Sequence, residues 1–144
     1  MGLDAVVYVN QKNLPMSLDR ENLEVDPLTG EVYFSDDEIA SRHPTEIFTA
    51  IHRRLGNVNL LAEVLASVSH VVKSDSILRG KVLKSFSHSG DIIPYDDLDA
   101  LANEIRLIKD QNRESGSSAL EEFFEDLSQL VRTAKQEQNP IVFV

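Results

Sequence analysis

The chain has 144 residues, no cysteine and a net charge of −10, from 14 basic and 24 acidic side chains. Its length and its hydrophobic content of 42% predict a single globular domain over residues 1–144. The absence of cysteine excludes disulfides, iron–sulfur clusters, thiolate zinc sites and a cysteine nucleophile. No apolar run approaches the roughly 18–20 residues of a membrane span. The first residues also lack a basic signal-peptide segment, so we expect a cytoplasmic protein with no membrane partner.

The first third of the chain predicts strands. Residues 3–9 form a nearly continuous apolar run, which is typical of a central strand covered on both faces. Residues 26–30, Asp-Pro-Leu-Thr-Gly, have the composition of a tight turn. Residues 31–34 then predict a short strand, with Val25 in its hairpin partner. Residues 35–38 match a capping box that opens a helical turn.

Two helices are predicted next. The first begins at His43-Pro44 and ends at Arg53 and Arg54, before Gly56. Its apolar stripe comprises Ile47, Phe48, Ile51 and Leu55. Asn57 caps the second helix, whose broad apolar face continues to Val72, includes a semi-buried His70 and should bury Leu61, Leu65 and Val68. Residues 74–86 fit a helix only loosely, because Gly80 interrupts them.

The last third predicts two amphipathic helices and a strand. One helix starts at Asp96 or Asp97, and the other starts at the capping box that Ser118 opens. Residues 112–117 break the pattern between them, and Asn139-Pro140 ends the second helix. Residues 141–144 are entirely apolar and predict a strand beside residues 3–9. The expected fold is therefore α+β, with four to five helices on a small sheet that includes the N-terminal and C-terminal strands.

The acidic residues cluster at predicted helix starts, as in Asp36-Asp37-Glu38 and Asp96-Asp97. Carboxylates at these positions stabilise the helix dipole, which is a sufficient structural reason for most of them. No segment has the ligand spacing of a calcium loop, and no glycine-rich phosphate loop is present. The sequence therefore predicts neither a metal site nor a cofactor. The net negative charge argues against nucleic acid as a partner and favours a partner with a basic surface.

A second candidate site is the polar loop that contains His88, Gly90 and Asp91 between two apolar segments. Histidine and aspartate in such a loop could serve as a general acid and base, or could bind a small molecule. No strand–turn–helix nucleophile motif accompanies them, so no catalytic residue is assigned. This loop supports the alternative hypothesis of a small-molecule-binding or hydrolytic domain.

Several segments resemble small bacterial immunity-type proteins, which accompany polymorphic toxins. The resemblance lies in Met1-Gly2-Leu3-Asp4 leading into a strand, Arg54-Leu55-Gly56-Asn57, and His88-Ser89-Gly90-Asp91-Ile92-Ile93-Pro94. It continues in the helix of Phe123 to Ala134 and the ending Asn139-Pro140-Ile141-Val142-Phe143-Val144. It implies a non-enzymatic protein that neutralises a cognate toxin, and the acidity would suit a basic, nuclease-type toxin.

The leading hypothesis is thus a protein-binding module whose partner is a protein, such as a basic toxin domain. The candidate binding residues come from both groups above: Asp36, Asp37, Glu38, His88, Asp91, Asp96 and Asp97. A structural module that assembles through a large apolar patch is a third hypothesis.

Overall fold

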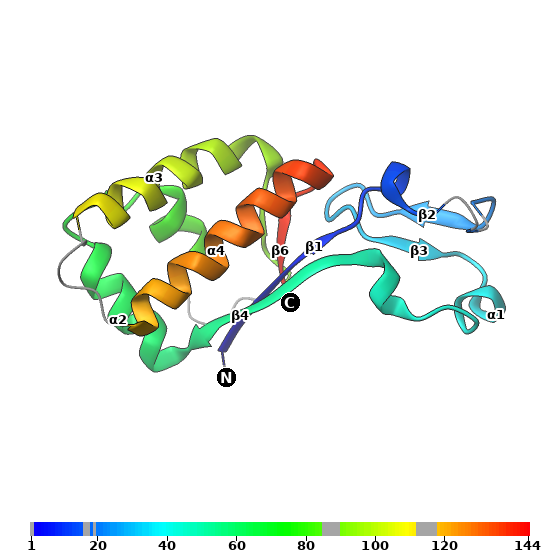
Figure 1. Ribbon diagram of the computed structural model, residues 1–144, viewed down its shortest axis with the longest axis horizontal. Coiled ribbons are helices and arrows are strands. Elements are labelled where there is room, and N and C mark those ends of the chain that lie inside the picture. Colours follow the sequence, from blue (N-terminus) through cyan, green and yellow to red (C-terminus); the bar gives the residue numbers. More distant parts are fainter. Residues whose placement is uncertain (1, 16–17, 19, 85–89, 112–117) are drawn as a thin grey trace.

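The computed structural model describes residues 2–15, 18, 20–84, 90–111 and 118–144, and it confirms an α+β fold. Figure 1 shows a main body of helices and strands at one end and a small lobe at the other, joined by two long strands. The small lobe is defined here as residues 9–48, and the rest of the chain is the main body. The elements in chain order are β1 (Gly2–Tyr8), η1 (Gln11–Asn13), β2 (Leu23–Val25), β3 (Val32–Phe34), α1 (Asp37–Ala40), η2 (Thr45–Phe48), β4 (Thr49–Asn57), α2 (Val58–Val68), η3 (Leu78–Val82), β5 (Ile92–Ile93), η4 (Tyr95–Asp97), α3 (Leu98–Gln111), α4 (Ser118–Glu137) and β6 (Ile141–Phe143).

The main sheet is antiparallel and has the strand order β4-β1-β6-β5. The first strand is therefore internal, as its apolar run predicts, and it pairs with β4 on one side and with β6 on the other. Ala5 lies opposite Phe143 and Val6 opposite Val142. The prediction that the N-terminal and C-terminal strands are neighbours is confirmed.

Helix α4 packs across β1 and β4, with α2 and α3 beside it. Its buried side chains recur at helical spacing and include Phe123, Phe124, Leu127 and Leu130, which confirms that this helix is amphipathic, as predicted. They meet Ala5 and Val7 and other inward-facing side chains of the sheet in one apolar core. In α2, Leu61 and Val68 are buried as expected, while Leu65 is only partly buried.

The predicted helix over His43–Leu55 is wrong. A 3-10 turn, η2, is followed by the nine-residue strand β4, so Arg53 and Arg54 lie within a strand and do not end a helix. A spacing of four between Ile51 and Leu55 fits both a helix face and a strand face, because four is also an even number of residues. Pairing with the apolar strand β1 decides in favour of the strand, which shows tertiary context overriding local pattern.

The second predicted helix is shorter than expected. Asn57 does cap it, because its side-chain oxygen accepts a hydrogen bond from the Leu60 backbone N–H at 2.9 Å. Helix α2 ends at Val68, however, and His70 is exposed in the following turn, so the prediction of a semi-buried His70 is wrong. Because the helix ends two residues before His70, this side chain does not lie on the buried apolar face of α2.

The ambiguous segment after α2 contains η3, a π-helix. Its first turn is held by Glu104 of α3, whose carboxylate accepts hydrogen bonds from the backbone N–H groups of Ile77 and Leu78 at 3.0 and 2.8 Å. Helix α3 begins at Leu98 after the 3-10 turn η4, and α4 begins at Ser118 as predicted. The predicted break over residues 112–117 falls outside the described residues.

The small lobe is built on the predicted hairpin of β2 and β3. In its turn, the Asp26 side chain accepts a hydrogen bond from the Leu28 N–H at 2.8 Å, and Gly30 has a φ of +77°. Its separate apolar cluster consists of the buried Leu14, Val32, Phe34 and Phe48, with partly buried neighbours. The lobe thus has a small core of its own next to that of the main body.

Polar contacts fasten the small lobe to the end of α4. The Asn10 side-chain amide donates to the Glu137 carbonyl at 2.8 Å, and the Asn13 amide donates to the Glu137 carboxylate at 2.7 Å. The Asn139 amide donates to the Tyr8 carbonyl at 2.8 Å. A Cβ atom at Gly30 would collide with the Asn139 amide, so the hairpin turn packs directly against this junction.

Gly30 therefore provides a test of the junction. We expect Gly30→Ala to destabilise the protein by more than Gly90→Ala, as measured in denaturant melts. Both glycines have positive φ, which costs about 1–2 kcal/mol for a residue with a Cβ. A Cβ at Gly90 meets no described atom within 4 Å, whereas one at Gly30 must displace Asn139, with a further loss of about 1 kcal/mol for its hydrogen bond. Equal losses in the two variants would show that the turn does not pack on Asn139 in solution.

Candidate functional site

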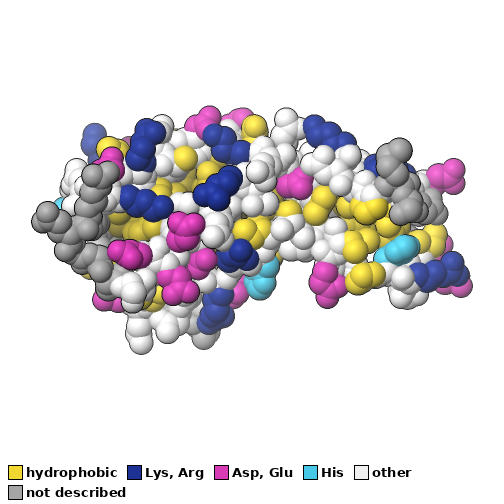
Figure 2. Space-filling model, in the orientation of Figure 1, with side chains coloured by type: hydrophobic (Ala, Val, Ile, Leu, Met, Phe, Trp, Pro, Cys, Tyr) yellow, Lys and Arg dark blue, Asp and Glu magenta, His cyan; other side chains and the backbone are white. Residues whose placement is uncertain are grey.

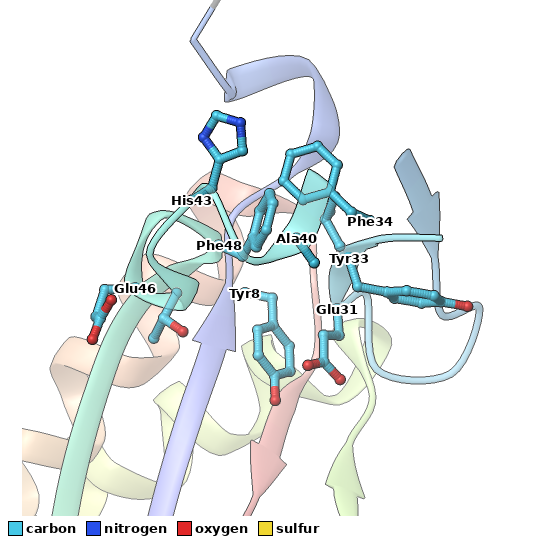
Figure 3. A pocket seen from close by; sticks show the side chains of 10 residues that line it. Tyr8, Glu31, Tyr33, Phe34, Ala40, His43, Glu46 and Phe48 are labelled. Atoms are coloured by element: carbon cyan, nitrogen blue, oxygen red, sulfur yellow. The ribbon is translucent and has the colours of Figure 1, made fainter. Parts of the chain in front are cut away.

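A pocket of about 300 Å³ opens where the small lobe meets the end of β1. The hairpin, α1, η2 and the first residue of β4 surround it, so segments far apart in sequence form its wall (Figure 3). Its lining residues are Tyr8, Glu31, Val32, Tyr33, Phe34, Ala40, His43, Glu46, Phe48 and Thr49. Aromatic and acidic side chains dominate this set.

The rear of the pocket is a fixed aromatic wall. Phe34 stacks on the His43 ring with centroids 5.0 Å apart, and it packs in an edge-to-face arrangement with Phe48, with centroids 5.5 Å apart. Phe34 and Phe48 are both buried in the small-lobe core. Because these rings are held by the core, the pocket is preformed, as ligand pockets usually are.

Tyr8 and Glu31 form the floor of the pocket. Figure 3 shows the Glu31 carboxylate beside the Tyr8 ring, near its hydroxyl. Burial raises the pKa of Tyr8, and the negative charges of Glu31 and Asp26 raise it further. The same charges that disfavour a phenolate here would attract a positively charged group.

The pocket carboxylates have no counter-ion in the part of the chain that is described. Glu31 and Glu46 are exposed, and neither makes an ion pair with a described residue. In the main body several acids pair with bases, as in Lys84–Asp91 at 2.9 Å and Arg53–Asp126 at 3.7 Å, although others, such as Asp96, pair with no described base. Glu31 and Glu46 differ from those others because they lie beside a pocket with aromatic walls.

The whole small lobe shares this excess of negative charge. Its 40 residues contain nine acidic and three basic side chains, more than half of the chain's net charge of −10. Its hairpin also exposes apolar groups, with Val25, Leu28 and Tyr33 exposed by 41%, 72% and 42%. Figure 2 shows hydrophobic side chains at the surface of this lobe, with acidic side chains at its margins.

Tyr33 has a polar partner on the outer face of the hairpin, the face opposite to the buried Val32 and Phe34. A hydrogen bond with the Glu24 carboxylate, and the charge of that carboxylate, raise the pKa of Tyr33. The two residues are cross-strand neighbours in the hairpin. In Figure 3 the Tyr33 ring points away from Tyr8, so its hydroxyl belongs to the outer surface more than to the pocket.

Three of the candidate residues from the sequence lie in this lobe. Asp36 caps α1, because its carboxylate accepts hydrogen bonds from the N–H groups of Glu38 and Ile39 at 2.9 and 3.4 Å. Asp37 and Glu38 are exposed in the first turn, and Glu38 lies 3.6 Å from Arg42. Asp36 therefore has a structural role as a helix cap, whereas Asp37 and Glu38 add negative charge to the surface.

The other candidates lie in the main body. Asp91 pairs with Lys84 at 2.9 Å, Asp97 pairs with Lys81, and Asp96 is exposed. His88 falls outside the described residues, so the hypothesis of a His88–Asp91 site stays a prediction. Figure 1 places α1 at the opposite end of the molecule from α3, so the two acidic groups do not form one surface.

A second charged cluster lies on the sheet face that α4 does not cover. Asp4 of β1 sits between His52 and Arg54 of β4, at 3.3 and 3.2 Å. These side-chain contacts join adjacent strands, and cross-strand pairing is a sufficient structural reason for them. Among the described residues, no group of three or more His, Cys, Asp or Glu side chains could hold a metal ion. No described helix is long and apolar enough to cross a membrane.

Sequence reasoning missed the pocket residues Tyr8, Glu31, Glu46 and Phe48. Each was assigned only to a strand or helix, and nothing in local spacing brings residues 8, 31 and 46 together. The alternating pattern in β3 could have shown that Val32 and Phe34 face a core, but not which core. Comparisons with known proteins add no signal, because no protein-family model, curated protein or solved structure matches the chain.

Proposed function

We propose that this chain is a non-enzymatic protein-binding module whose small lobe binds a protein with a basic surface. The observation that carries the proposal is the excess of acids in that lobe, several of them without a counter-ion, around exposed apolar side chains. Interfaces commonly combine apolar and aromatic contacts with a polar rim, and opposite charge accelerates the encounter.

A toxin domain fits this description of the partner. The resemblance to immunity-type proteins implies such a partner, and a nuclease-type toxin with a basic substrate-binding face would complement the small lobe. Binding would then neutralise the toxin by covering that face. We place this activity in the cytoplasm, in keeping with a chain that has no cysteine.

Site-directed photo-crosslinking in the native host tests the proposal. A photoreactive phenylalanine analogue at Tyr33 should capture a basic protein, whereas the same analogue at Leu107 should not. Leu107 is a matched control because it is similarly exposed, at 52%, and lies on α3 at the other end of the molecule. Capture of the same proteins at both positions would contradict the proposal.

The captured partner then allows a kinetic test. The triple variant Asp36→Asn, Asp37→Asn and Glu38→Gln should associate with it about tenfold more slowly at low salt, because steering depends on charge. The difference should disappear at high salt, where the Debye length falls to ~3 Å. Asparagine can still cap α1, so the fold should be retained. An association rate that depends on neither salt nor these residues would contradict charge-steered binding.

A further inference from the structure

We propose that the pocket seats one arginine side chain of the basic partner, stacked on the Tyr8 ring and paired with the Glu31 carboxylate. This inference rests on the proposed function and names the contact that would anchor the partner. The pocket is built for a positive group, since it combines aromatic rings with carboxylates that no described cation neutralises.

The size of the pocket indicates one side chain. Its volume of about 300 Å³ is at the lower end for ligand sites. A larger molecule would meet the fixed wall of Phe34 and Phe48, whose positions are set by the small-lobe core. A single side chain inserted into a preformed pocket is the usual form of an interface anchor, and arginine is among the residues most common in that role.

The shape of the lining favours arginine over lysine. Cations bind above the face of an aromatic ring, and a planar guanidinium also stacks on it. Figure 3 shows the Glu31 carboxylate beside the Tyr8 ring, where both its oxygens could accept the paired N–H groups of a guanidinium. Glu46 lines the same pocket from η2 and supplies a second negative charge. A lysine ammonium is not planar, so it could not stack on the Tyr8 ring and pair with both oxygens of Glu31 at the same time.

Titration with capped amino acids tests the inference without the partner. N-acetyl-L-arginine amide is added to the isotopically labelled full chain, and amide resonances are followed by NMR. We expect saturable shifts at Tyr8, Glu31 and Thr49, with a dissociation constant of about 1 mM, because a lone side chain lacks the rest of the interface. The neutral isostere N-acetyl-L-citrulline amide and the lysine analogue should bind several-fold more weakly. Equal binding of either analogue, or no shift at these residues, would overturn the inference.

Paired variants identify the carboxylate. Glu31→Gln should weaken binding of the arginine probe about tenfold, because it removes the negative charge and one of the two oxygens that accept from the guanidinium. Glu63→Gln makes the same chemical change at an exposed position of α2 in the main body and should leave binding unchanged. A loss of affinity in both variants would show a general charge effect and would overturn the pocket assignment. Tyr8→Leu should also weaken binding, and an unchanged affinity would exclude stacking on that ring.

The two proposals can fail separately. If Glu31→Gln binds the captured partner as tightly as the unmodified chain while the α1 triple variant associates slowly, the arginine anchor is wrong and the acidic lobe remains the binding surface. If the arginine probe binds in the pocket but Tyr33 captures no basic protein, the proposed function is wrong and the pocket remains a site for guanidinium groups.

Discussion

Replacing Leu127 by alanine should lower the free energy of unfolding by about 2–5 kcal/mol, the usual cost of truncating a buried leucine. Leu127 is fully buried on the inner face of α4, which crosses both β1 and β4. The cavity would open in the centre of the main core, where surrounding strands and helices leave little room for collapse. Denaturant melts with an unchanged slope would measure the loss.

Leu107→Ala is the matched control for this variant. Leu107 also lies on a helix of the main body, but 52% of it is exposed, so the same substitution should change stability by no more than about 0.5 kcal/mol. A loss below about 1 kcal/mol for Leu127→Ala would mean that the inner face of α4 is not core.

Removing residues 141–144 should abolish cooperative folding. Strand β6 lies between β1 and β5, so its removal leaves β1 without one partner and detaches β5 from the sheet. It also removes Ile141 and Phe143, both fully buried. The truncated protein should aggregate, because unpaired strand edges associate with other chains. A soluble product with the original melting temperature would contradict the sheet order.

A milder pair of variants tests the same strand in a folded protein. Phe143→Ala should cost about 3–5 kcal/mol, the range for a buried phenylalanine. Val144→Ala, one residue further, should change stability by no more than about 0.5 kcal/mol, because Val144 is about half exposed and its strand-side contact is through its backbone N–H.

Much of the fold could be predicted from the sequence where its patterns are local. The apolar face of α4 repeats over five turns, and Ser118 gives its start. The turn at Asp26 and Gly30 likewise fixes the hairpin through short-range chemistry. In each case the residues that determine the structure are a few positions apart, and their spacing fits one type of secondary structure only.

Strand β4 shows where such reading fails. Its inward positions, Ile51 and Leu55, are spaced by four and so match a helix, while Pro44 is also a common helix start. What decides the matter is β1, more than forty residues earlier, whose apolar run needs an antiparallel partner. A spacing compatible with both periods can be resolved only by knowing the partner.

The candidate site was even less accessible to prediction. The acidic residues that cluster in the sequence have structural roles: Asp36 caps a helix, and Asp97 pairs with Lys81. Glu31 and Glu46 stand alone in the sequence and become neighbours of one pocket only when the small lobe docks on β1. Such a site is defined by the meeting of segments, and single-sequence patterns do not encode that meeting.

The internal position of β6 also sets the order in which the fold can form during synthesis. Strand β1 is made before both of its partners, and β6 follows it by more than 130 residues. Until β6 is made, the apolar side chains of β1 depend on β4, which pairs along the length of β1 and follows it by about forty residues. We expect a β1–β4 pair to cover these side chains during that interval. Because contacts this distant in sequence form slowly, a cell that makes this protein quickly should need a chaperone during that interval.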